Sequence, residues 1–211
     1  MNSGRLISIE GIEGAGKSTL LQSIVSYLSQ LNIPVCQTRE PGGTPVAESI
    51  RHLLLHAHPD EPLSCRAELL LMFASRIQHL EGLILPALAQ GQWVICDRFI
   101  DASFAYQGAG RGLGFDQVQP IADWSMNGCQ ADLTFLLDLP VEQAMHRLRG
   151  RNKDKIEQED AAFFESVRNA YLEQAALAPK RFCILDATLP PSKLAEHAQD
   201  ILNARLMSNV V

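Results

Sequence analysis

The segment from residue 11 to residue 18 constrains this chain most, because it matches the pattern GxxxxGK(S/T) in full. An apolar run, residues 6–9, comes directly before it, and a helical pattern begins at Thr19. A turn between a strand and a helix can present backbone N–H groups, a lysine and a helix N-terminus to phosphate groups. Glycines let the backbone approach the phosphates closely. The sequence therefore predicts a phosphate-binding loop in preference to a glycine-rich turn that matches by chance.

Within this loop, Lys17 is expected to reach the outer phosphates, and the Ser18 hydroxyl is expected to bind Mg²⁺. The residues predicted to bind the nucleotide here are Gly11, Ile12, Glu13, Gly14, Ala15, Gly16, Lys17, Ser18 and Thr19.

Composition excludes several classes of protein. The 211 residues suit one domain, and the 46% hydrophobic and 20% charged residues are ordinary for a globular chain. No apolar stretch is long enough to span a bilayer, so a cytosolic protein is expected. The five cysteines form no CxxC pair, which argues against a zinc site. A net charge of −6 argues against binding to a nucleic-acid polymer, because that requires a broad positive surface.

Strand and helix patterns alternate along the chain, which predicts an α/β fold with a five-stranded parallel sheet flanked by helices. Ligands of such sheets bind at the carboxyl ends of the strands. The predicted strands are residues 6–10, 33–39, 93–97, 132–138 and 182–186. The predicted helices are residues 17–31, 47–56, 67–90 with a kink at Pro86, 141–149, 158–178 and 192–206.

Polar residues follow two of these strands. The second strand runs into the charged, glycine-rich segment 38–44, and the third ends at Asp97 and Arg98. An exposed ion pair is the simplest explanation of such neighbours. Beside a phosphate-binding loop, however, the carboxylate is placed to hold Mg²⁺ or its water, and the arginine to bind a phosphate.

Residues 147–155 hold five basic side chains in nine positions between two predicted helices. A charge run is usually a solvated face. With a phosphate-binding loop in the same domain, we interpret it as a lid that closes over the phosphates and supplies positive charge.

Together these motifs resemble the bacterial thymidylate kinase family, which transfers the γ-phosphoryl group of ATP to dTMP for dTTP synthesis. The resemblance covers nearly the whole chain in the order of the family's motifs. It rests on residues 11–18, 38–44, 71–76, 97–99, 105–108, 154–157 and 186–188. It implies the three-layer P-loop kinase fold as a single domain over residues 1–211, with a lid at about 147–157. It also implies a homodimer, for which the apolar helix 67–90 offers a self-complementary face.

The resemblance also implies roles for individual residues. Lys17 and the loop amides would hold ATP, Ser18 and Asp97 would serve Mg²⁺, and Arg98 and Arg39 would bind the acceptor. Glu13 would lie near the deoxyribose and the acceptor phosphate. The residues implied to contact the nucleoside are Phe73, stacked on thymine; Arg76, donating to its O4; Ser103, at its N3 edge; Tyr106, against the sugar; and Gln107.

Without the resemblance, these side chains would be interpreted differently. Phe73 would be a core residue, Arg76 an arginine on a helix surface and Ser103 a loop hydroxyl. Tyr106 would fit a half-buried packing position as well as a ligand contact.

The family keeps a catalytic cation either in the P-loop or in the lid, and no basic residue lies between Ile12 and Ala15. The lid is therefore expected to carry it, on Arg149 or Arg151, with Arg147 against adenine. Lys155 stands where many relatives have arginine, and lysine offers a point charge instead of a bidentate fork.

Two alternatives remain at this stage. One is a P-loop kinase with another small acceptor, which would lack the thymine contacts. The other is a regulatory GTPase, but residues 152–155 only half resemble its NKxD segment, and no DxxG occurs in the chain.

Overall fold

A five-stranded, all-parallel sheet with strand order β2-β3-β1-β4-β5 forms the centre of the molecule. The structure, a computed structural model, describes residues 4–56, 60–150 and 155–207. The strands are β1 (Leu6–Glu10), β2 (Val35–Arg39), β3 (Trp93–Asp97), β4 (Leu133–Asp138) and β5 (Phe182–Asp186). The helices are α1 (Lys17–Gln30), α2 (Pro45–Leu55), α3 (Cys65–His79), η1 (Leu80–Ile84), α4 (Leu85–Ala89), α5 (Ile100–Ser103), η2 (Phe104–Gly110), α6 (Phe115–Met126), α7 (Val141–Arg147), α8 (Ala161–Leu177), α9 (Pro191–Leu202) and η3 (Asn203–Met207). The predicted α/β fold is confirmed.

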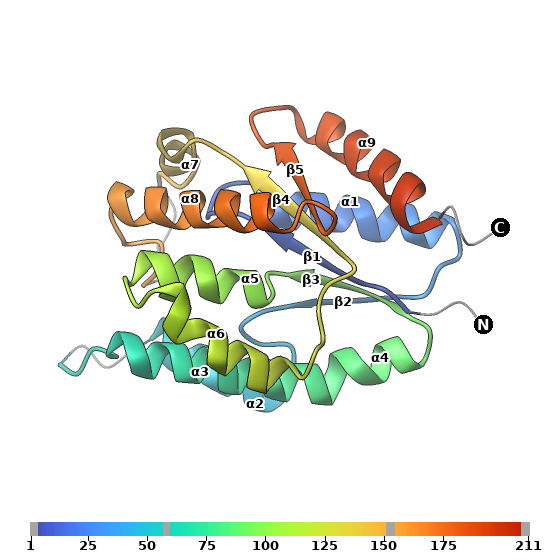
Figure 1. Cartoon of the computed structure of the whole chain (residues 1–211). Helices are drawn as coiled ribbons and strands as arrows, with labels where there is room; N and C mark the ends of the chain where they lie inside the picture. The colour runs from blue at the N-terminus through green and yellow to red at the C-terminus, as the bar shows by residue number, and fades with distance from the viewer. Residues whose placement is uncertain (1–3, 57–59, 151–154, 208–211) are drawn as a thin grey trace.

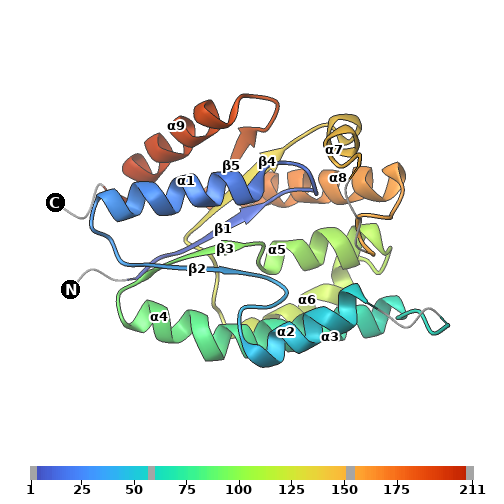
Figure 2. The ribbon, with the colours of Figure 1, turned by 180° about the vertical axis from the view of Figure 1, so that it is seen from behind.

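Helices cover the sheet on both faces (Figures 1 and 2). Figure 2 shows α1 and α9 in front of the sheet, and Figure 1 shows α8 and α5 on the opposite side. The group α2, α3, α4 and α6 lies toward the β2 end of the sheet (Figure 1). Two buried apolar clusters join these layers, one centred on β1 and β4, the other beneath α3, α4 and α6. Among the described residues, no helix combines the length and apolarity needed to cross a bilayer.

Local sequence signals set the starts of several helices. Thr44 Oγ1 accepts the Ala47 N–H before α2, and Pro45 occupies the first position, where its missing N–H costs nothing. Asp160 caps α8 in the same way by accepting the Phe163 N–H at 2.8 Å. These caps place the helix starts within three residues of the predicted positions.

The helix predicted over residues 67–90 is instead three consecutive segments, α3, η1 and α4. The π-helical turn η1 ends one residue before α4, which carries Pro86 at its second position. Proline donates no N–H and crowds the preceding turn, and a π turn relieves both conflicts. The predicted disturbance at Pro86 thus takes the form of a widened turn before the proline.

Residues 100–126 form α5, η2 and α6, where the sequence pattern indicates no helix. Four glycines between residues 108 and 114 resemble a loop in composition. Tertiary packing overrides this, because Gly110 lies so close to Phe163 that a Cβ there would come within 2.7 Å of the ring. Small residues in this segment therefore allow η2 to pack closely on α8.

Register brings the functional ends of the strands together. Ile9 on β1 and Arg39 on β2 both pair with Asp97 on β3. The P-loop after β1, the charged turn after β2 and the acid–arginine pair after β3 therefore lie at one edge of the sheet.

Candidate active site

The loop between β1 and α1 has the tight geometry that a P-loop requires. Gly11 has a φ of 135°, and a Cβ there would lie 2.6 Å from the Leu137 carbonyl oxygen. Only glycine fits this position. The loop ends at Gly16, after which α1 begins at Lys17 with its first N–H groups directed into the loop.

The Lys17 side chain curls back over this loop. Its Nζ donates to the carbonyl oxygens of Gly11 at 3.0 Å and Ile12 at 2.9 Å. Burial and, to a smaller extent, the nearby charge of Arg98 lower the pKa of Lys17 to about 8, against the opposing effect of neighbouring carboxylates. A phosphate in the loop would favour the charged form of this lysine.

Arg98 follows β3 in the left-handed backbone region, with a φ of 68°. Its guanidinium donates to the Gly11 carbonyl at 3.0 Å and to Glu13 Oε1 at 2.5 Å, and it lies over the ring of Tyr106 at 4.7 Å. The Tyr106 hydroxyl donates to the other Glu13 oxygen at 2.7 Å. Burial raises the pKa of Tyr106, so its hydroxyl keeps its proton. Arg98, Glu13 and Tyr106 form one rigid cluster beside the P-loop.

A pocket of about 440 Å³ opens beside this cluster. Ser18 and Asp97 line it, as do four arginines: Arg39, Arg51, Arg98 and Arg147. Arg51, which the sequence motifs do not predict, donates from Nη1 to the Pro41 carbonyl at 2.8 Å. Helical spacing could have indicated this position, because residues 48, 51 and 55 lie on one face of the helix that follows the charged turn. Basic side chains thus gather at this pocket beside four carboxylates, and the planar guanidinium groups are suited to binding phosphates.

The side chains predicted to contact thymine lie deeper. Phe73 is 2% exposed and Arg76 is 1% exposed, and neither lines this pocket. Arg76 donates to Glu40 Oε2 at 2.6 Å, to Ser103 Oγ at 2.8 Å and to the Phe99 carbonyl at 3.1 Å. The interpretation of Arg76 as a surface arginine is therefore wrong, and Ser103 lies in α5 instead of a loop. Nη1 and Nη2 of Arg76 each carry a second N–H, so its contact with a base stays a prediction.

Replacing Arg76 with leucine is expected to lower the free energy of unfolding by about 3 kcal/mol. Glu40 is 4% exposed and, among the residues that the structure describes, would keep only His79 as a side-chain hydrogen-bond partner, at 3.1 Å. A buried carboxylate that loses its cation is strongly destabilising. Urea denaturation measures the change, and the exposed Arg66 on the same helix, replaced by leucine, is the control, expected within about 0.5 kcal/mol of the wild type. Equal stability of the two variants would contradict the prediction.

Gln107 is also buried, at 1% exposure, and donates to Glu68 Oε1 at 3.0 Å. Arg111 donates to the same oxygen at 3.1 Å and to Glu159 at 2.5 Å. This network ties η2 to α3 and to the segment that follows the predicted lid. Gln107 Oε1 is a buried atom without a hydrogen-bond partner within the described part of the chain.

The predicted lid is described in part. Arg147 donates to the carbonyls of Gly14 at 3.2 Å and Ala187 at 3.0 Å, so it bridges the P-loop and the turn after β5. Arg149 follows α7 and is exposed, and Arg151 lies outside the described residues. Residues 156 and 157, after the gap, line the P-loop pocket. The segment therefore begins and ends at this pocket.

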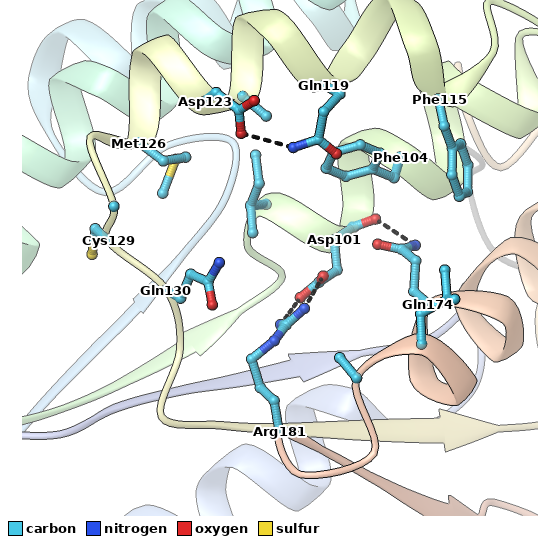
Figure 3. Close-up of a pocket in the computed structure, with 15 residues that line it drawn as sticks. Asp101, Phe104, Phe115, Gln119, Asp123, Met126, Cys129, Gln130, Gln174 and Arg181 are labelled. Carbon is cyan, nitrogen blue, oxygen red and sulfur yellow. Dashed lines mark hydrogen bonds and ion pairs between the residues drawn. The ribbon is translucent and has the colours of Figure 1, made fainter.

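A second cavity, of about 310 Å³, lies between α5, α6 and the end of α8. Figure 3 shows Asp101 and Arg181 facing each other at its base, with contacts of 2.5 and 2.8 Å. Gln174 donates to the Asp101 carbonyl at 3.2 Å. No P-loop residue lines this cavity, and its charged base is neutralised internally. The pocket beside the P-loop is therefore the better candidate for binding phosphate groups.

The parallel sheet, the P-loop and the arginine-lined pocket are those of a P-loop protein of the small-molecule kinase class. A sequence profile described as thymidylate kinase matches residues 9–198. The chain belongs to the thymidylate kinase family, which confirms the resemblance and argues against the regulatory GTPase. The segment of this chain that half resembles the NKxD motif of GTPases, residues 152–155, lies mostly outside the described residues.

Relatives named thymidylate kinase cover nearly the whole chain. The protein from Chromohalobacter salexigens is 54% identical over 189 residues, which are 89% of this chain and 89% of that protein. The protein from Teredinibacter turnerae is 48% identical over 97% of this chain and 100% of its own length. The protein from Cupriavidus metallidurans is 48% identical over 94% and 98%, respectively.

Proposed function

We infer that this protein is a dTMP kinase, which transfers the γ-phosphoryl group of ATP to dTMP and so forms dTDP for dTTP synthesis. The observation that carries this inference is the family match over residues 9–198, in a chain whose P-loop opens on a pocket lined by four arginines. Two anionic substrates that meet in one cleft need such a concentration of positive charge.

The P-loop and Lys17 hold the phosphates of ATP in this proposal, with Arg147 on the adenine side. Support comes from the contact of Arg147 with the Gly14 carbonyl, which places this side chain at the outer wall of the loop. Arg149 and Arg151 supply charge from the lid to the transferred group.

Arg98, Arg39 and Arg51 bind the acceptor phosphate in this proposal, because all three line the pocket. Glu13 and Tyr106 meet the deoxyribose, since they are bonded to each other beside Arg98. The base would lie beyond them, toward Phe73, Arg76, Ser103 and Gln107. Arg39 is held at 3.0 Å from Glu48 on α2, so substrate binding would compete with that ion pair.

Mg²⁺ bound with ATP fits the residues present. Ser18 and Asp97 line the pocket and offer oxygen ligands, which Mg²⁺ prefers. Among the described residues, no group of three His, Cys, Asp or Glu side chains could hold a metal. This suits a cation that takes one or two protein ligands and completes its shell with phosphate oxygens and water. When bound, the ion would neutralise charge on the phosphates.

The chain's own contribution to the reaction is alignment and charge. Lys17 fixes the donor phosphates and Arg98 the acceptor phosphate, so that the attacking oxygen lies in line with the γ-phosphorus. No general base is needed, because a nucleotide phosphate is already ionised at neutral pH. Lid closure would exclude water and so suppress hydrolysis of ATP.

The proposal is tested by measuring ADP release from ATP and Mg²⁺ in the presence of each of six acceptors: dTMP, dUMP, dCMP, dGMP, AMP and thymidine. A strong preference for dTMP supports the proposal. Preference for another member of the panel would retain the kinase but discard the thymine contacts, and no ADP release with any acceptor would remove the kinase activity.

We also propose that the protein is a cytoplasmic homodimer and that each chain forms a single domain. Leu70 on α3 and Trp124 on α6 are 58% and 77% exposed, and these two helices are in contact. Large exposed apolar side chains on neighbouring helices favour a contact with a second copy.

Replacing both Leu70 and Trp124 with glutamate is therefore expected to convert the dimer to a monomer, because burying two carboxylates would oppose association. Sedimentation equilibrium measures the mass. Leu177, 76% exposed on α8, is the matched control, and its glutamate variant should stay dimeric. A monomeric wild type, or a dimeric double variant, would exclude this surface.

A further inference from the structure

Glu10 is a buried acid that the roles above do not use. It is the last residue of β1, one position before the P-loop, and is 0% exposed. A carboxyl group in such a position is costly unless its oxygens have partners. Both oxygens do: Oε1 accepts the Phe99 N–H at 2.6 Å, and Oε2 accepts the Tyr171 hydroxyl at 2.7 Å.

The first of these bonds acts on the backbone that carries Arg98. The Arg98 N–H donates to the Ile9 carbonyl at 3.0 Å, and the next N–H along the chain donates to Glu10. Arg98 itself has a φ of 68°, a conformation that costs a non-glycine residue of order 1–3 kcal/mol and persists only when neighbours enforce it. Two consecutive bonds to the end of β1 provide that enforcement.

The second bond acts on the Arg98 side chain. Tyr171 on α8 has its hydroxyl 3.5 Å from Arg98 Nη1, and its ring packs edge-on against Tyr106, with centroids 6.3 Å apart. Tyr106 in turn lies beneath the guanidinium of Arg98. Glu10 therefore reaches the backbone of Arg98 through Phe99, and its side chain through Tyr171 of α8.

We propose that Glu10 is a positioning residue, which through Phe99 and Tyr171 fixes Arg98 in the conformation that binds the acceptor phosphate. The inference rests on the proposed function, since it assigns Arg98 to dTMP. Glu10 touches no substrate in this account. Burial and, to a smaller extent, the neighbouring charge of Asp101 raise the pKa of Glu10 to about 8, so the group is mostly uncharged near neutral pH.

Glu10→Met tests the inference, because it keeps the length of the side chain and removes both oxygens. The dissociation constant of dTMP, measured by calorimetry, is expected to rise about tenfold, the equivalent of one good hydrogen bond. The affinity for ATP should stay within about twofold, because Lys17 has its own carbonyl partners. Glu10→Gln should restore dTMP binding to within about threefold, because the amide oxygen still accepts the Phe99 N–H.

The decisive comparison is made in an Arg98→Ala background. If Glu10 acts through Arg98, Glu10→Met will add less than a twofold loss of dTMP affinity there. An equal loss in both backgrounds would overturn the proposal. Should Glu10→Met fail to fold, Tyr171→Phe takes its place, with an expected loss of about threefold that also disappears in the Arg98→Ala background.

Ser8→Ala is the matched control, because Ser8 is equally buried on β1 and bonds Thr134 at 2.8 Å, with no link to Arg98. It should leave dTMP affinity within about twofold. A wild-type protein that neither binds nor phosphorylates dTMP would overturn the proposed function and this inference together. A wild type that does both, with Glu10→Met equal to Ser8→Ala, would overturn this inference alone.

Discussion

Lys17→Met is expected to lower kcat by about 10³-fold while the substrate-free protein stays as stable as the wild type or becomes more stable. The activity is expected to fall because, in the proposed function, the Lys17 ammonium group is the cation that the P-loop places at the outer phosphates. Its charge matters most in the transition state, when negative charge spreads over the transferred group.

The stability effect has the opposite sign because this charge is buried before ATP arrives. Burial lowers the pKa of Lys17 from 10.5 to about 8. At pH 7 the lysine is charged in both the folded and the unfolded protein, so the folded state bears the full cost, on the order of 3 kcal/mol. The two carbonyl contacts of Nζ offset part of this cost. Methionine fills similar space without a charge.

Steady-state kinetics and urea denaturation at pH 7 measure the two effects in one preparation. Lys193→Met is the control, because Lys193 is exposed and forms an ion pair with Glu196, three residues away on the same helix. It should change kcat by less than twofold. A Lys17→Met enzyme within tenfold of wild-type kcat would remove Lys17 from the catalytic account, whatever its stability.

The parts of this site that the sequence predicts are those encoded in short segments. The P-loop is formed by eight consecutive residues, and the sequence pattern fixes the positions of its first and last glycines. Asp97 and Arg98 were predicted because a buried strand that stops at two charged residues is unusual. In both cases neighbours in the sequence are also neighbours in the site.

The parts that sequence reasoning missed depend on contacts between distant segments. Glu10 resembles any polar residue at a strand end, and its role appears only when Tyr171, 161 positions later, reaches its carboxyl group. Arg76 follows an apolar run on a helix, and nothing in that run shows that Glu40 will neutralise it in the interior. The helices α5 and η2 are stabilised by packing on α8, which local propensity cannot anticipate.

Replacing Arg149 or Arg151 of the proposed lid with alanine is expected to lower kcat by about 10³-fold. The KM for dTMP is expected to change by less than about threefold. The P-loop has no basic side chain between Ile12 and Ala15, so a further cation, in addition to Lys17, is expected from the lid. Arg147 and Arg98 are already bonded to the carbonyls of Gly14 and Gly11.

Such contacts hold groups in place before the reaction begins, whereas the proposed transition-state cation would approach the γ-phosphate when the proposed lid closes. Arg149 is exposed beyond α7, and the chain returns to the pocket at residue 156. Turnover of both single variants and the double variant distinguishes the two arginines. Arg205→Ala, at an exposed arginine of η3, controls for loss of surface charge and should keep kcat within twofold. Wild-type turnover in the double variant would show that the lid only covers the site, and the charge of Lys17, Arg98 and the metal would then have to suffice for transfer.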